Sequence, residues 1–302
     1  MSRYRSIFGL LALIFVVCAA VELVLRWSGA GVSLTDTRGV GQVGLFVIII
    51  PFLIGFAARR GGGPLVFMKP YNANFGRALA GFAAMWVQAV LLMIIAYALL
   101  SWMGYVSWSQ EAWANFSLTL LRKTITALLV VVVLAYTEEM IFRAFVMRHL
   151  RYNGTFWVGF WAVVIGSAIF SVTHLISYKD AWTLWDVGGL LFGLWLLGSL
   201  FAITYIATGS IACSMGVHAG LLGFKVFLRR TDLLVYQPDV WWLGGTEDIR
   251  MAPISWLLMI LIAAITWATR HQLRKHFYIE PAIADWDKPG RATTDRTSTT
   301  RN

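Results

Sequence analysis

Long apolar runs bounded by polar or basic residues dominate the pattern of this chain. About 20 helical residues cross a hydrocarbon core of about 30 Å, and several of the runs reach that length. Backbone polar groups must pair within each span, so helices are expected. The pattern predicts an all-α polytopic membrane protein with about eight transmembrane helices in one bundle, at residues 6–27, 40–58, 78–103, 124–150, 156–176, 184–207, 210–228 and 254–269.

The segments between the runs differ in composition. Residues 104–123 mix Trp108 and Trp113 with polar side chains, which is typical of a segment at the membrane surface. The end of the chain is polar and predicts a disordered tail. The predicted parts are N-terminal helices 1–3 with the interfacial segment at 1–123, a helical core at 124–229, a loop and last helix at 230–276, and the tail at 277–302.

Composition supports a membrane protein. Hydrophobic residues make up 59% of the chain and charged residues 13%, whereas soluble domains have roughly 45–50% and 25%. The net charge of +10 would suggest nucleic acid in a soluble protein, but here Lys and Arg stand at the ends of apolar runs and in the tail. They are interpreted as membrane anchors, so the bilayer is the predicted partner and nucleic acid is not.

Basic residues also predict the orientation. An even number of helices places both termini on one side, and the basic loop at 59–77 and the basic segment at 270–275 fall on that side. The positive-inside rule therefore predicts cytoplasmic termini. The prediction is a multi-pass protein of the cell membrane, interpreted as a prokaryotic plasma membrane, with the oligomeric state left open.

Charged residues inside the fourth run are the main candidates for function. The sequence YTEEMIFR places Glu138, Glu139 and Arg143 in an apolar helix, where each charge costs about 2.5–3.5 kcal/mol on insertion scales. Residues four apart share a helix face, so Glu139 and Arg143 are predicted to pair. Glu138 faces elsewhere, toward apolar residues such as Leu134 and Phe142.

Two histidines add polar groups from other runs. His174 and His218 stand in the interior of predicted spans, whereas His149, His271 and His276 stand at helix ends. A carboxylate and two histidines on three helices can meet inside a bundle, where they can activate water, bind a metal or relay protons.

The order E-E-x-x-x-R, then F-x-x-x-H, then a later intramembrane His resembles the CPBP family. This family of intramembrane glutamic-type proteases includes type II CAAX prenyl endopeptidases and bacteriocin-processing or self-immunity proteins. The resemblance covers residues 124–229 and implies hydrolysis of a peptide bond within the bilayer, with no cofactor or metal.

The resemblance also implies a role for each matching residue. Glu138 would be the general base, His174 would help to hold and polarise the water, and His218 would face the developing oxyanion. Supporting roles would fall to the pair Glu139 and Arg143 and to Phe170, which packs beside the site.

The chain departs from the family at one position. Many members carry Asn or Asp four residues after the last histidine, where this chain has Leu222. Loss of an oxyanion donor lowers rates by roughly 10²- to 10³-fold. Ser214 and Lys225 share approximately the face of His218 and are predicted as possible replacement donors.

The predicted function is an intramembrane endopeptidase acting on a membrane-associated peptide or protein. A zinc-dependent variant would use the same residues, although the chain lacks a helical H-x-x-x-H pair. The alternative from another class is a non-catalytic membrane immunity or interaction protein that retains the polar cluster. A proton-coupled transporter is a third possibility, although no inverted repeat is evident.

Overall fold

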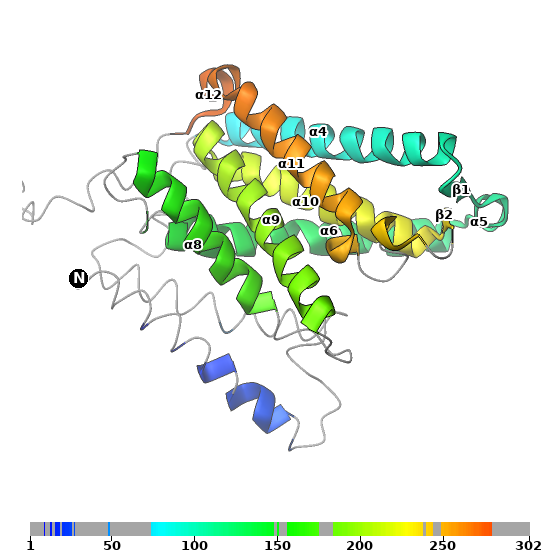
Figure 1. The fold of residues 1–302 in the computed structure, drawn as a ribbon, viewed down its shortest axis with the longest axis horizontal. Helices are drawn as coiled ribbons and strands as arrows, with labels where there is room; N and C mark the ends of the chain where they lie inside the picture. Colours follow the sequence, from blue (N-terminus) through cyan, green and yellow to red (C-terminus); the bar gives the residue numbers. More distant parts are fainter. Residues whose placement is uncertain are drawn as a thin grey trace, which may run out of the picture.

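A computed structural model describes most of the chain from residue 74 onward (Figure 1). The predicted run at 40–58 lies outside the described residues except for residue 48, and the run at 6–27 is described only in part. The tail from residue 280 also lies outside them. The described residues are 9, 13, 16–18, 20–25, 27, 48, 74–147, 150, 156–174, 184–237, 240–243 and 249–279.

Helices account for most of the described residues, which confirms the predicted class. The α-helices are α4 (Phe75–Trp102), α5 (Gln110–Ala114), α6 (Leu118–Glu139), α8 (Phe156–His174), α9 (Leu184–Thr208), α10 (Ile211–Thr231), α11 (Pro253–Ala268) and α12 (Arg270–Phe277). The π-helix η1 (Met140–Met147) continues α6, and two 3₁₀ turns are η3 (Trp241–Leu243) and η4 (Ile249–Met251).

Four of the described helices are long and apolar enough to cross a membrane. They are α4, α6 with η1, α9 from Val187, and α10. A fifth span results if α11 and α12, which meet at a bend of 69°, are taken together. These spans agree with the predicted runs in the same regions. The total of eight stays a prediction.

The predicted interfacial segment contains structure that the hydrophobic pattern does not reveal. Strand β1 (Val106–Trp108) pairs antiparallel with β2 (Leu234–Tyr236), and the two form a small sheet. Helix α6 begins at Leu118, six residues before the expected position, because Ser117 caps it by accepting a hydrogen bond from the Leu120 N–H at 3.2 Å. The basic residues at 122 and 123 therefore lie on the surface of the helix.

Helix α10 lies at the centre and packs against α4, α6 and α9. Gly216 and Gly220 face α4: a Cβ at Gly220 would meet that of Ala89 at 2.9 Å, and one at Gly216 would collide with the Phe82 carbonyl. Small residues four apart let two helices approach closely. His218 stands half a turn from both glycines, so this packing directs it away from α4, toward α6 and α9.

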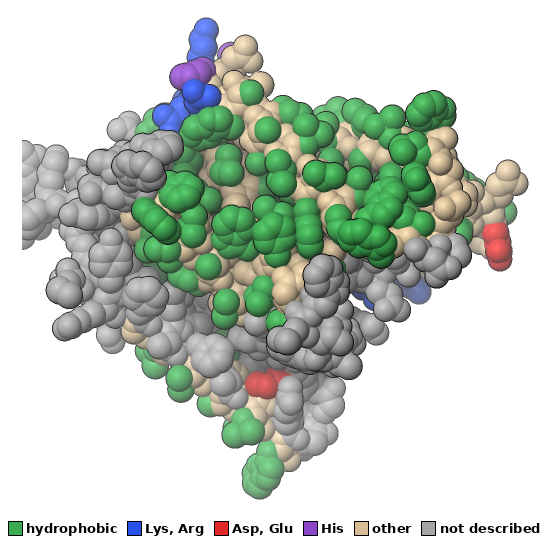
Figure 2. Space-filling view, viewed as in Figure 1, with side chains coloured by type: hydrophobic (Ala, Val, Ile, Leu, Met, Phe, Trp, Pro, Cys, Tyr) green, Lys and Arg blue, Asp and Glu red, His purple; other side chains and the backbone are tan. Residues whose placement is uncertain are grey.

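The remaining helices surround this centre. Helix α8 packs on α9, α11 packs on α9 and α4, and α12 lies against α9 and α4. Apolar side chains cover the face over α4 and α11 in Figure 2. Leu91 and Ile95 of α4 and Leu257 of α11 are exposed. This outer surface is suited to lipid, whereas Glu139, Arg143 and His218 are buried in the interior.

Candidate active site

The two adjacent carboxylates lie where α6 changes to a π-helix. Glu138 and Glu139 are the last residues of α6, and η1 follows without a break. Short π-helical segments are rare and occur frequently at functional sites. Every side chain from Ile141 to Met147 is buried, including that of Arg143. The change of helix type therefore brings a guanidinium into the interior beside the carboxylates.

Glu139 and Arg143 form a fully buried ion pair. Both side chains are 0% exposed, and Arg143 Nε lies 3.3 Å from Glu139 Oε2. Arg143 Nη2 donates to the Gly198 carbonyl at 3.0 Å, and the guanidinium lies 5.6 Å and 5.7 Å from the ring centroids of Phe170 and Phe201. Removing one partner of such a pair costs about 3–5 kcal/mol. The pair ties η1 to α8 and α9.

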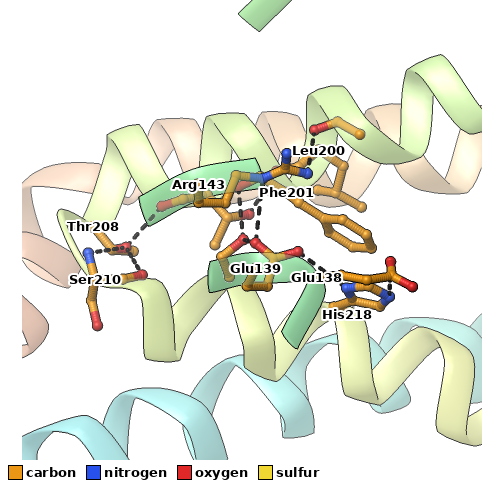
Figure 3. Close-up of polar contacts among 11 residues, drawn as sticks. Glu138, Glu139, Arg143, Leu200, Phe201, Thr208, Ser210 and His218 are labelled. Carbon is orange, nitrogen blue, oxygen red and sulfur yellow. Dashed lines mark hydrogen bonds and ion pairs between the residues drawn. The ribbon is translucent and has the colours of Figure 1, made fainter. Parts of the chain in front are cut away.

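Glu139 also binds two side chains of α10 (Figure 3). Ser214 Oγ donates to Glu139 Oε2 at 2.5 Å, and His218 Nδ1 lies 3.1 Å from Glu139 Oε1. An ionised carboxylate only accepts hydrogen bonds, so Nδ1 of His218 is the protonated nitrogen. Consequently Nε2 of a neutral His218 presents its lone pair on the other side of the ring, where Glu138 lies.

Glu138 is more accessible, with 15% of its side chain exposed. Its Oε2 lies 3.6 Å from Nε2 of His174 and 3.7 Å from Nε2 of His218. Nδ1 of His174 lies 2.7 Å from the Phe170 carbonyl, to which it donates, so Nε2 again faces the carboxylate. Both imidazoles come from other helices, His174 from α8 and His218 from α10.

Aromatic rings hold both imidazoles in place. Phe201 stacks on His218 with centroids 4.2 Å apart and planes 16° apart, and the centroid of Phe170 lies 4.3 Å from that of His174. The same two phenyl rings face the guanidinium of Arg143. Phe201 was not predicted, since it stands in a continuous apolar run without a motif.

The geometry around Glu138 suits a small polar group held between the three side chains. Separations of 3.6 Å and 3.7 Å exceed a direct hydrogen bond and are of the kind that a bridging oxygen can span. Glu138 can accept a proton there, and either imidazole can orient the bridging group. Among the described residues, no group of three or more His, Cys, Asp or Glu side chains is arranged to hold a metal ion.

The segment that carries these residues matches a known protein family. Residues 120–222 match the family described as type II CAAX prenyl endopeptidase Rce1-like. This stretch forms an Rce1-like domain. The match confirms the resemblance predicted from the motifs, and it contains Glu138, His174 and His218. No curated protein and no solved structure matches the chain.

The Rce1-like domain extends from the beginning of α6 to the middle of α10. It covers about a third of the chain, and it leaves out α4, α11 and α12. Helix α4 nevertheless supports the domain directly, since it packs along the glycine face of α10. The site therefore depends on helices on both sides of the matched segment.

The predicted replacement donors occupy different surroundings. Ser214 belongs to the cluster, but its hydroxyl lies 2.5 Å from Glu139 Oε2 and 2.9 Å from the Phe201 carbonyl, so its one hydrogen is already engaged. The role of Ser214 as a possible oxyanion donor stays a prediction. Leu222 packs in an apolar cluster with Val131 and Ala135 of α6. Lys225 is half-buried two turns beyond His218.

Arg250 is a further charged residue near the site that the motifs did not indicate. It lies in η4, where its carbonyl accepts a hydrogen bond from the Trp256 indole at 2.8 Å and closely approaches Gly193 of α9. The turn packs on α9, which also carries Gly198 and Phe201 of the site. No sequence signal could have located it, because the turn is far along the chain and only its packing on α9 and α11 places it in the bundle.

Proposed function

We propose that this protein is an intramembrane endopeptidase of the glutamic type, which hydrolyses a peptide bond of a membrane-associated peptide or protein. One observation carries the proposal: within an Rce1-like domain, Glu138 Oε2 lies 3.6 Å and 3.7 Å from the Nε2 atoms of two histidines. A base and an orienting group at this spacing are what activation of a water molecule requires.

Glu138 acts as the general base in this proposal. Its carboxylate takes one proton from a water molecule oriented by His174, and the resulting hydroxide attacks the amide carbonyl carbon. The carbon–oxygen double bond opens to an oxyanion. When the carbon–nitrogen bond breaks, protonated Glu138 returns the proton to the leaving nitrogen, so the proton count is restored.

His218 faces the developing oxyanion in this proposal. Because Nδ1 remains bonded to Glu139 at 3.1 Å, Nε2 can donate to an oxyanion only when the ring is the doubly protonated imidazolium. The stack on Phe201 fixes the ring plane, and the bond to Glu139 fixes its rotation. This arrangement supplies a donor for the oxyanion without an amide at position 222.

The experiment compares membrane proteomes with mapped protein termini from cells that carry wild-type protein and Glu138→Gln. Termini that depend on Glu138 identify substrates, and they should also disappear with His174→Ala and His218→Ala, while each variant remains folded by thermal unfolding. Identical termini in wild-type and Glu138→Gln cells would overturn the proposal.

The apolar surroundings of Leu222 favour one alternative, a non-catalytic immunity or interaction protein. That protein would use the cluster to specify the bundle, and Glu138→Gln would leave protection or partner binding intact. Inhibition of cleavage by a chelator, reversed by zinc, would instead indicate metal-dependent hydrolysis.

A further inference from the structure

Helix α12 leaves the bundle at an angle that suits the membrane surface. It begins at Arg270, directly after α11, and the two axes differ by 69°. Its sequence, RHQLRKHF, is polar and only eight residues long, so α12 cannot cross a membrane by itself. We expect a polar helix that turns in this way at the end of an apolar helix to lie along the interface.

The two faces of α12 have different chemistry. Leu273 and Phe277 pack against the hydrophobic core, whereas His271, Lys275 and His276 are exposed. An apolar face toward the protein and a basic face outward are typical of an amphipathic helix at a membrane surface. The basic face is therefore available to a partner outside the bundle.

Hydrogen bonds fasten this helix to the end of α9 and the start of α4. Arg274 donates from Nε to the Ala207 carbonyl at 3.1 Å and from Nη2 to the Ile206 carbonyl at 2.8 Å. Arg77 Nη1 donates to the Tyr278 carbonyl at 3.3 Å. These contacts hold the basic side chains at fixed positions. A guanidinium has five N–H donors, so each arginine retains donors and its full charge for a ligand.

Positive charge is concentrated at this end of the molecule. Blue and purple side chains gather over α12 in Figure 2, while the acidic side chains visible there lie elsewhere. Neither α12 nor α4 contains an acidic residue. Arg270 lies over the ring of Trp267, 4.8 Å from its centroid, and tryptophan is enriched where membrane and water meet. The positive charge of α12 thus lies beside a tryptophan of the kind found at the membrane surface.

We propose that α12 and the first turn of α4 bind the headgroups of anionic phospholipids. We call this the α12 surface, and it consists of Arg77, Arg270, Arg274 and Lys275, with His271 and His276 beside them. Clusters of four or more basic residues next to a membrane helix are attracted to anionic lipid, each contributing about fivefold to affinity. Because Arg274 holds the last carbonyls of α9, bound lipid also stabilises the turn from which α10 begins.

The test measures lipid retention by the purified full chain with native mass spectrometry. Wild-type protein in neutral detergent is mixed with short-chain phosphatidylglycerol or phosphatidylcholine. We expect preferential retention of phosphatidylglycerol, weakened about fivefold by Lys275→Gln and further by Arg270→Gln added to it. Lys275→Arg keeps the charge and should retain the lipid. Thermal unfolding of each variant shows whether it is folded.

Arg229 and Arg230 provide the matched control. They are exposed basic residues in the last turn of α10, at its opposite end from the start that adjoins α9. The variant with both changed to Gln should retain phosphatidylglycerol like the wild type. Equal retention of the two lipids by wild-type protein, equal losses in the two double variants, or displacement of the lipid by equimolar inorganic phosphate would each overturn the proposal.

Discussion

The adjacent residues Glu138 and Glu139 have opposite environments. Glu139 is completely buried and its oxygens are occupied by Arg143, Ser214 and His218. Glu138 is partly exposed, and its Oε2 has no direct hydrogen bond among the described residues. A carboxylate with every position filled stabilises a fixed arrangement, whereas one with an open position can exchange protons. The comparison shows how one turn of helix supplies both structure and chemistry.

The largest expected effect separates these two carboxylates. Glu138→Gln should lower cleavage by roughly 10²- to 10⁴-fold, because an amide cannot act as a base, and should leave the unfolding temperature close to that of wild type. Glu139→Gln is the matched variant, and it should lower the unfolding temperature because Arg143 loses its buried counter-charge. The two variants are distinguished by two measurements: cleavage of a substrate identified by mapping termini, and thermal unfolding. If both variants lowered the unfolding temperature by similar amounts, the two carboxylates would not have the different roles assigned to them.

Arg143→Met tests the buried ion pair between Arg143 and Glu139. We expect a loss of about 3–5 kcal/mol in the free energy of unfolding, because Glu139 would remain buried without its cation. Arg143→Lys keeps the charge but not the planar guanidinium between Phe170 and Phe201, so its loss should be smaller. Equilibrium unfolding in mixed micelles measures both, and an Arg143→Met protein as stable as wild type would contradict the assigned role.

Ser214→Ala tests the hydrogen bond from α10 to Glu139. Removing this buried donor should cost about 1–3 kcal/mol. The control is Ser167→Ala, because Ser167 is also fully buried and its hydroxyl has no hydrogen bond among the described residues. That variant should be close to neutral. Equilibrium unfolding in mixed micelles measures both variants. Equal losses in the free energy of unfolding would mean that the contact between Ser214 and Glu139 does not stabilise the protein.

Phe201→Leu should have the smallest effect. The change removes the stack on His218 and the contact with Arg143, and aromatic pairs contribute about 0.5–1.5 kcal/mol beyond their buried area. We expect a several-fold loss of cleavage with modest destabilisation, because the ring plane of His218 is less restricted. Phe160→Leu, on the exposed side of α8, is the control. Full cleavage activity in Phe201→Leu would show that the Phe201 ring does not contribute to the site.

Parts of this site could be predicted from local spacing. Glu139 and Arg143 stand four residues apart, and helix geometry alone predicts that they can pair. The partners of Glu138 could not be derived in this way, because His174 and His218 lie on other helices. Phe201 and Arg250 had no recognisable motif. The start of α6 was misplaced because the hydrophobic pattern does not reveal the Ser117 cap.

The sequence by itself determined the membrane class, the spans formed by α4, by α6 with η1, by α9 and by α10, and the presence of unusual interior charges. Hydrophobic length and helical period act locally, so they can be read along the chain. Only the tertiary structure decided which carboxylate is enclosed and which is open. That depends on the glycine face of α10 approaching α4, on η1 bringing Arg143 inward and on α8 placing His174 beside Glu138, all of which are contacts between distant segments.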